Sequence, residues 1–599
     1  MVPFKTKLQC SIYLVIAAFL VASFANASDP ITLVEEGIRP SEHKDLENDK
    51  INQLNAMKDI VQSGGEKIEK VEITVNPIFD ENNPKENYWI FRLANKLHPL
   101  TRKRVVADDL FFKQGDDFDQ DLIDASERLL NTRRYLAKSS IVVENDANKE
   151  AIAKVNVRDV WTLKPQFSVS RSGGDNKYSY GIEDTNFLGT GKGITISRYG
   201  NAERSGSVFE YYDPNTGAYN SRFIVKYADN EDGKLVETSL IRPFLDFSTE
   251  WAGGLAFKDL TGDKILYSGG ETVEQFGHME TESSIFYGRQ IGISYDVNGE
   301  RTVSRILSGF TRENNEFFIH DDKLSDPIFN IGELPEARQF DTAWIEYQRV
   351  DDGYIKTTNT QQINRAEYIN LGQQLRFRFG LYNNGVADGT YGDSTHGDST
   401  YGDRGYLFQS EYSFGALLPV RDLFLTSFSL DGKYSENGLL FDTTFSASAS
   451  YYWRNMERGQ MLVKLEGTKG FNLYKDTPLE LGGDTGLRGF PSHYQAGDRR
   501  LFLNVEQHFF GKKEWFSLFH AGFAVFFDVG RAWGSTDIAQ IDDGLLKDVG
   551  VGIRLSGTRT GNREEGAHNI LHVDLVRPIG TYPGDVSGLQ VRVGVEKHF

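Results

Sequence analysis

The chain has 599 residues, with 66 basic and 85 acidic side chains and a formal net charge of −19. This acidic balance argues against nucleic acid as a partner. Aromatic residues make up 13% of the chain and glycine occurs 59 times. Such a composition is typical of a membrane β-barrel, which needs aromatic girdles and many tight turns between short strands.

The N-terminus carries the pattern of an export signal. Lys5 and Lys7 precede an apolar run at 11–24, and Ala25-Asn26-Ala27 is a small-x-small cleavage pattern. We therefore predict a secretory signal peptide at 1–27. The single cysteine, Cys10, lies within it, so the mature chain is expected to have no disulfide. Beyond residue 27 no apolar run approaches the roughly 20 residues of a membrane helix, which leaves a soluble periplasmic protein or an outer-membrane barrel.

Residues 28–66 are polar and charged, and they predict a periplasmic leader that contains a short helix. The apolar side chains of this segment recur at the spacing of one helix face. They are Ile51, Leu54, Met57, Ile60 and Val61. An alternative for the same pattern is a helix that plugs the lumen of a barrel.

Residues 68–163 predict a small α/β domain. Strands are expected at 71–75, 139–144 and 151–160, and helices at 87–97 and 119–137. The second helix has an apolar stripe formed by Leu122, Ile123, Leu129, Leu130 and Leu136. The order is therefore β-α-α-β-β, directly before a region rich in strands.

The C-terminal region alternates between apolar and polar residues in five segments, at 499–510, 523–530, 547–556, 569–576 and 589–599. In the last one Leu589, Val591, Val593 and Val595 lie on one face, opposite a charged face. An apolar exterior with a wet interior is what a closed transmembrane sheet requires. We predict a transmembrane antiparallel β-barrel of about sixteen strands over 165–599. Val591, Val593, Val595 and the terminal aromatic Phe599 are expected to act as a C-terminal assembly signal.

A glycine-rich loop at 482–498 brackets one cation, Arg488. The sequence GGDTGLRGFPSHYQAGD places glycines at 482, 483, 486 and 489, where they allow backbone shapes closed to other residues. In the strand at 523–530 one face is formed by Phe523, Val525, Phe527 and Val529, so Asp528 is expected to face the other way, into the lumen. A lumenal carboxylate is a partner that an arginine can bind through two nitrogens.

Several motifs resemble the BamA/TamA outer-membrane assembly superfamily, also described as the bacterial surface antigen family. They are LFFKQGDDFDQDLIDASERLLNTRRYL at 110–136, AKVNVRDVWTLKP at 153–165, the tetrad Leu487-Arg488-Gly489-Phe490, and FFDVGRAW at 526–533. The resemblance implies that 68–163 is a POTRA domain in the periplasm and 165–599 a barrel in the outer membrane of a Gram-negative bacterium. It also implies that the 482–498 loop folds into the lumen and that Arg488 pairs with Asp528.

This reading predicts a protein that inserts or moves client polypeptides without covalent chemistry, a cofactor or a metal. An edge strand of the POTRA domain would capture an extended client. The seam between the first strand, at 166–172, and the last, at 589–599, would open to template client strands into lipid. The expected partners are outer-membrane lipids and unidentified client polypeptides.

Three alternatives stay open at this point. A two-partner secretion translocator would pass its client through the lumen, but it would need two POTRA modules and only one is evident. A passive pore would not need residues 28–163. A barrel enzyme lacks a nucleophile, base and acid arrangement, because the Gly-Asp-Ser motifs at 392–394 and 397–399 lie in a polar tandem repeat at 388–406 that predicts an outer loop. The eleven histidines show no metal-ligand spacing.

Overall fold

The computed structural model describes residues 67–596, apart from 85, 146–150, 173–174, 202, 218–219, 297–299, 321–327, 329–332, 386–403, 420–421, 537–540, 542, 560–569, 583–585 and 587. They belong to one compact unit that begins at Lys67. The predicted signal peptide, the predicted leader, most of the 388–406 repeat and Phe599 therefore lie outside the described residues.

An α/β domain comes first, as predicted. Its elements are β1 (Ile68–Asn76), α3 (Trp89–Leu97), α4 (Lys103–Asp108), α5 (Gln120–Thr132), β2 (Leu136–Asn145) and β3 (Ala151–Asp159). The strands form one sheet in the order β1-β3-β2, with β1 parallel and β2 antiparallel to β3. Ile123 and Leu130 of α5 are buried in a core with Val155 and Val157 of β3, so the amphipathic stripe of α5 covers one face of the sheet.

The predicted helix at 119–137 is five residues too long. Helix α5 ends at Thr132, and Leu136 begins β2. The buried Arg133 and Tyr135 both bind Asp109, and these contacts fix the chain in a turn where the apolar spacing alone would continue the helix. The short helix α4 has only six residues, too few for a periodic pattern to predict it.

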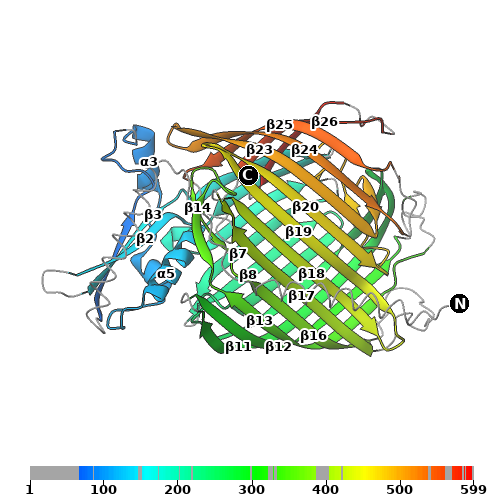
Figure 1. Ribbon diagram of the computed structural model, residues 1–599, viewed down its shortest axis with the longest axis horizontal. Coiled ribbons are helices and arrows are strands. Elements are labelled where there is room, and N and C mark those ends of the chain that lie inside the picture. The colour runs from blue at the N-terminus through cyan, green and yellow to red at the C-terminus, as the bar shows by residue number, and fades with distance from the viewer. Residues whose placement is uncertain are drawn as a thin grey trace. The chain divides into compact units, whose positions relative to one another are not determined.

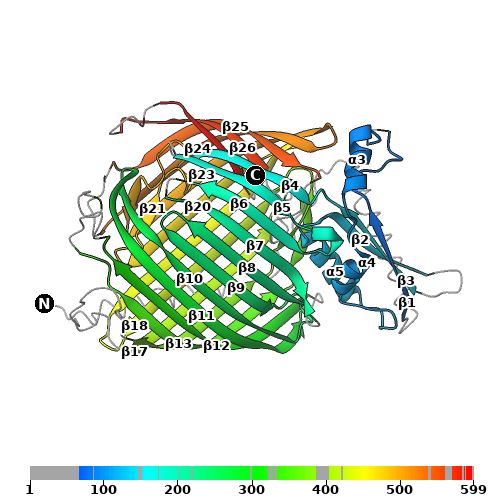
Figure 2. The same cartoon turned by 180° about the vertical axis from the view of Figure 1, so that it is seen from behind.

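The rest of the chain forms a closed antiparallel barrel (Figures 1 and 2). Its first ten strands are β4 (Leu163–Ser172), β5 (Asp175–Asp184), β6 (Gly193–Gly200), β7 (Ser205–Thr216), β8 (Ser221–Asn230), β9 (Gly233–Arg242), β10 (Trp251–Ser268), β11 (Glu271–Tyr295), β12 (Arg301–Phe318) and β13 (Arg338–Asp351). The others are β16 (Gln374–Gly385), β17 (Arg404–Leu417), β18 (Leu423–Ser435), β19 (Leu440–Met456), β20 (Gly459–Phe471), β23 (Arg499–Trp515), β24 (Phe519–Trp533), β25 (Leu546–Gly557), β26 (Ile570–Pro578) and β27 (Gln590–Glu596).

The described residues thus place twenty strands in the barrel, and the predicted number of about sixteen was too low. The prediction assumed long connections after every second strand. Several connections are instead tight turns, such as residues 231–232 between β8 and β9 and 269–270 between β10 and β11. Shorter connections leave more of the chain for strands.

Side chains alternate between the two faces of the wall as predicted. In β24, Ala524, Phe526 and Asp528 are buried, while Phe523, Val525 and Phe527, which alternate with them, are exposed. The exposed face is therefore the apolar outside, and the buried polar face lines the interior. No helix among the described residues is long and apolar enough to cross a membrane.

The seam between the last and first strands is the weakest contact in the wall. Over the residues that the structure describes, strand β27 pairs with β4 at one position, Val593 with Arg171. By contrast, β27 pairs with β26 at seven positions and β4 with β5 at ten. Among the described residues, the ladder of paired backbone groups that holds the other strand pairs is thus reduced to one residue pair at the predicted seam.

The α/β domain contacts one end of the barrel, which we call the domain end. The Arg102 N–H donates to the Gly189 carbonyl in the β5–β6 turn, and the Asn215 side chain in β7 donates to the Asp108 carbonyl. Since the chain enters β4 at this end, the connections after β5, β13 and β25 return to it. The connection after β20 starts at the opposite end, which we call the far end.

Candidate functional site

The 472–498 connection folds from the far end into the barrel, as predicted. Its short strands β21 (Leu479–Leu481) and β22 (Gln495–Gly497) pair with each other. Leu487 and Phe490 are buried in one cluster with Phe502 of β23, Ala532 of β24 and Leu546 of β25. Gly486 has a φ of 125°, a backbone shape that glycine adopts without strain.

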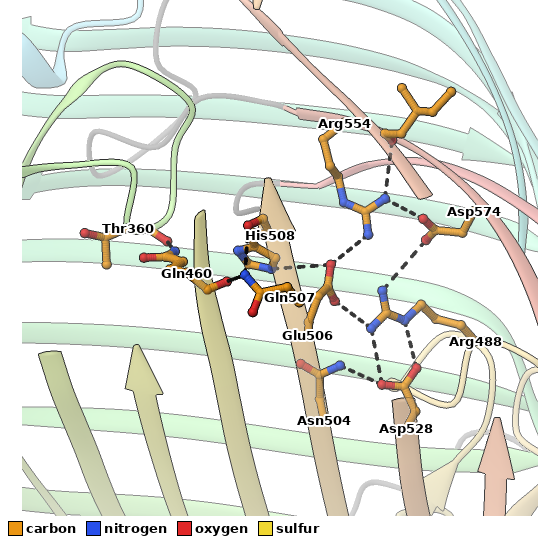
Figure 3. Close-up of polar contacts among 11 residues, drawn as sticks. Thr360, Gln460, Arg488, Asn504, Glu506, Gln507, His508, Asp528, Arg554 and Asp574 are labelled. Carbon is orange, nitrogen blue, oxygen red and sulfur yellow. Dashed lines mark hydrogen bonds and ion pairs between the residues drawn. The ribbon is translucent and has the colours of Figure 1, made fainter. Parts of the chain in front are cut away.

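Arg488 is the centre of the site (Figure 3). Its Nε and Nη2 donate to the two carboxylate oxygens of Asp528 at 2.8 and 3.2 Å, and Nη2 also donates to Glu506 Oε2 at 2.8 Å. The guanidinium lies over the ring of Phe526, 3.4 Å from the centroid. The predicted pairing with Asp528 is therefore present, and the site adds a second carboxylate and an aromatic face to it.

A second arginine extends this network around the wall. Arg554 of β25 donates to Glu506 Oε1 at 2.9 Å and is also paired with Asp574 of β26. Asp574 Oδ2 lies 3.9 Å from Arg488 Nη1. Two buried cations thus share three buried carboxylates that come from β23, β24 and β26. This arrangement ties the loop to three strands near the seam.

The backbone beside Arg488 is also bound to the wall of the barrel. The Gly489 N–H donates to Asp548 Oδ2 of β25 at 2.9 Å. A Cβ atom at position 489 would lie 2.9 Å from the Asp548 Cβ, so any larger residue would push the loop off the wall. Phe490 packs edge-on against Tyr582, with 4.9 Å between ring centroids.

His493 holds the outer part of the loop. Its ring lies 2.6 Å from Glu480 Oε2 and stacks on Tyr267 of β10, with centroids 4.4 Å apart. Burial lowers the pKa of His493, but the hydrogen bond with Glu480 and the charges of nearby Asp484 and Glu203 outweigh it, so the net pKa is raised above 6.5. These acidic neighbours therefore favour the protonated ring more than water does.

A second segment enters the barrel from the domain end, and the sequence did not predict it. The connection between β13 and β16 forms a hairpin of β14 (Tyr354–Thr358) and β15 (Ala366–Asn370). The tip of this hairpin, residues 359–365, is shaped by Glu367, which accepts the backbone N–H groups of Thr360, Gln361 and Gln362 at 2.8 to 3.2 Å. We call residues 354–370 the hairpin plug.

The tip of the hairpin plug reaches the opposite wall. Ile363 is fully buried against Phe510, Ala524 and Ile570, from β23, β24 and β26. The Gln460 side chain of β20 donates to the Thr360 carbonyl at 2.7 Å (Figure 3). Since β26 is nine strands from β13 in the twenty-strand order, the hairpin plug spans the domain end of the lumen.

The hairpin plug also binds the α/β domain. The Tyr368 hydroxyl donates to Glu127 Oε1 of α5 at 3.1 Å, and Arg128 of α5 lies 5.0 Å from the ring centroid of Tyr354. Arg365 donates to the carbonyls of Ala137 in the domain and Gly557 in β25, at 3.2 and 3.1 Å. One element thus connects the domain, the lumen and the wall.

The structure brings together Leu487, Arg488, Gly489, Phe490 and Asp528, as the sequence predicted. It adds Glu506, Arg554 and Asp574, whose inward orientation follows from strand alternation but whose convergence depends on the register of three strand pairs. Val591 is exposed on the outer face, while the side chain of Val595 lies outside the described residues. Within the described part of the chain, no group of three or more His, Cys, Asp or Glu residues is arranged to hold a metal.

Comparison with known proteins gives matches among solved structures only. No protein-family model and no curated protein matches the chain. BamA from Haemophilus ducreyi lacking POTRA domains 1–3 is 11% identical, with 88% of this chain and 84% of that chain covered and a TM-score of 0.35. CdiB from Escherichia coli is 11% identical over 88% and 76%, with a TM-score of 0.44, and CdiB from Acinetobacter baumannii is 12% identical over 89% and 73%, with a TM-score of 0.36. At such low values the assignment of the fold rests on the strand order and pairing of this chain.

Proposed function

We propose that this chain is an outer-membrane assembly barrel of the BamA/TamA type, which inserts client polypeptides into the membrane through the β4–β27 seam. The α/β domain, read as a POTRA module in the periplasm, captures an extended client by strand addition. The domain end of the barrel then faces the periplasm. No step in this route needs covalent chemistry or a cofactor.

The single observation that carries the proposal is the seam itself. In the described part of the chain one residue pair joins β27 to β4, whereas the neighbouring strand pairs are joined at seven and ten positions. An edge with unpaired N–H and C=O groups is a template for another strand. In lipid these groups must find partners, so a client strand that binds there satisfies groups that the closed barrel leaves open.

The two segments inside the barrel support insertion through the seam over passage through the lumen. A passive pore needs an open lumen, and a secretion translocator needs one that opens for its client. Here the loop at 472–498 is bound by buried ion pairs, and the hairpin plug spans the domain end. Passage through the lumen would have to break both sets of contacts.

Disulfides between introduced cysteines can block the route through the seam or the route through the lumen separately. In a Cys10→Ser background, Arg171→Cys with Val593→Cys would cross-link the seam, since the two residues are register partners. The readout is the amount of folded outer-membrane barrel protein in cells that depend on the variant, before and after reductant. We expect the cross-link to lower this amount and reductant to restore it.

The matched control joins Val573→Cys to Val593→Cys, a register pair between β26 and β27 that should not open. A third variant, Ile363→Cys with Ile570→Cys, ties the hairpin plug to the wall. Equal effects of the seam and control cross-links would refute insertion through the seam. Loss of function only with the tied hairpin plug would favour a route through the lumen.

A further inference from the structure

Helix α3 has an exposed apolar face. Trp89 is 69% exposed, Leu97 is 66% exposed, and Ile90 and Leu93 between them are also exposed. These four residues lie on one side of the helix at the spacing of an amphipathic helix. The next apolar residue along the chain, Leu100, is exposed as well. Exposed apolar residues gathered in this way usually mark an interaction surface.

The opposite side of α3 already has its partners within the domain. The Phe91 ring stacks on Phe79, with 4.1 Å between centroids, and Asn95 exchanges hydrogen bonds with the Phe79 backbone at 2.9 and 3.1 Å. These contacts fix the rotation of the helix. The apolar face of Trp89, Ile90, Leu93 and Leu97 is therefore presented outward by the fold.

Anchors at both ends place α3 at the domain end of the seam. Before the helix, Glu86 accepts a hydrogen bond at 2.7 Å from Arg559, which follows β25. After it, the Thr101 hydroxyl accepts from the Asn186 side chain at 2.8 Å, and the Arg102 N–H donates to Gly189, both in the turn that follows β5. The strands between these two attachment points are β26, β27, β4 and β5.

The apolar outside of the barrel continues onto this helix. On β5 the outward side chain of Ile182 is 59% exposed, and in the turn after it Phe187 and Leu188 are exposed too. This turn is bound to the segment that follows α3. The lipid-facing surface next to the seam is therefore extended by Phe187 and Leu188 toward the apolar face of α3.

Basic residues surround this apolar face in an otherwise acidic chain. Lys96 is exposed on α3, and Arg102, Lys103 and Arg104 follow the helix and are exposed. Within the described part of the chain, one of these four cations forms an ion pair, Arg104 with Asp108 at 3.6 Å. Apolar residues flanked by cations are the composition of helices that lie in the interface of an anionic membrane.

We propose that α3 is a membrane-surface helix, which inserts Trp89, Ile90, Leu93 and Leu97 into the lipid leaflet next to the seam. Its cations bind the lipid phosphates. This inference rests on the proposed membrane location of the barrel, and it adds a lipid contact made by the α/β domain. The contact holds the domain at the place where a client would enter the bilayer.

Site-specific fluorescence in reconstituted membranes tests the proposal. The full chain, with Cys10→Ser, carries a single environment-sensitive fluorophore at Leu97→Cys, Val142→Cys or Ile196→Cys. Val142 is an exposed apolar residue on β2 of the same domain, and Ile196 is exposed on the outside of β6. Each protein is placed in vesicles of phosphatidylethanolamine and phosphatidylglycerol, and quenching by brominated lipid and by aqueous iodide is measured.

We expect brominated lipid to quench the label at 97 several-fold more than the label at 142, and nearly as much as the label at 196. Iodide should show the reverse order. Adding Leu93→Glu should lower lipid quenching at 97 and leave it unchanged at 196. Quenching at 97 by iodide alone would overturn the proposal, and so would protection from both quenchers, which would mean that protein covers the face. Lack of lipid quenching at 196 would instead refute the membrane location of the barrel.

Discussion

At the scale of single residues, the site depends on what a guanidinium can do and an ammonium cannot. Arg488 binds Asp528 through two nitrogens, contacts Glu506 with one of them and lies flat on Phe526. A planar group with five donors can make these contacts together, whereas a lysine offers a point charge. The second cation of this network, Arg554, is fully buried. The charges are therefore stabilised by one another rather than by water.

Removing Arg488 should therefore release the loop. Arg488→Ala leaves Glu506 and Asp528 buried with only part of their compensating charge, and we expect a loss of about 3 kcal/mol in the free energy of unfolding. Asp528→Asn should cost less, and the double variant should be less than additive. Urea unfolding and protease access to the loop in intact cells measure both effects.

The control for this experiment is Arg499→Ala. Arg499 lies at the start of β23 with half of its side chain exposed, next to Asp498 at 3.4 Å. An exposed pair of this kind contributes little, so stability and loop protection should stay close to those of the wild type. Additive effects of the Arg488 and Asp528 substitutions would contradict direct coupling between them.

Part of this site could be predicted from the sequence. Alternation along β24 showed that Asp528 faces inward, and the glycines around Arg488 indicated a tightly folded loop. The contributions of Arg554 and Asp574 could not be predicted in this way, because they meet Glu506 only through the registers of β23 to β26. A shift of one residue in any register would turn these side chains to the lipid.

At the scale of elements, the hairpin plug is the feature that could not be predicted from the sequence. Its strands have five residues each, and the tip places Asn359 and Asn364 at positive φ, 57° and 53°. Such a segment has the composition of an ordinary polar loop. Within the tip at 359–365 the one apolar residue is Ile363, and only the tertiary structure shows that Ile363 is buried against the opposite wall.

A charge at the tip of the hairpin plug should open the domain end of the lumen. Ile363→Asp removes the apolar contact with Phe510, Ala524 and Ile570 and places a carboxylate there, and we expect a cost of at least about 2 kcal/mol. The measurement is single-channel conductance in planar bilayers, which should rise in this variant. Thr358→Asp, with the same charge at an exposed position of β14, should leave the conductance unchanged. If the Ile363→Asp variant shows no rise in conductance, the hairpin plug does not limit the current.

At the scale of the whole molecule, the barrel class was predictable because it depends on a repeating pattern, whereas the number of strands depends on the length of every connection. The last five strands were expected at 499–510, 523–530, 547–556, 569–576 and 589–599, and all five occur. The seam was expected between the first and last strands, and the sparse pairing of β27 with β4 agrees with that. The extra strands come from short connections, such as the two-residue turns at 231–232 and 269–270, which the alternating pattern alone does not predict.

A closed sheet with this many strands should resist detergent until it is boiled. We expect unboiled protein from outer membranes to migrate faster in cold detergent gels than boiled protein, because the paired backbone keeps the barrel compact. Deleting Phe599 should lower the heat-modifiable fraction by weakening the assembly signal. Phe516→Ala changes an exposed aromatic in a turn instead, and it should have no such effect. Unchanged mobility on boiling would contradict a closed barrel.

The hairpin plug is anchored at its base near α5 and contacts the wall with its tip. Five residues of paired strand span about 17 Å, so a tilt of about 10° at the base displaces the tip by about 3 Å, the length of one hydrogen bond. Such a displacement would detach Ile363 and Arg365 from the wall while the β14–β15 ladder stays intact. A small rotation of the α/β domain, too slight to disturb its own core, would then be amplified into opening of the lumen at the domain end.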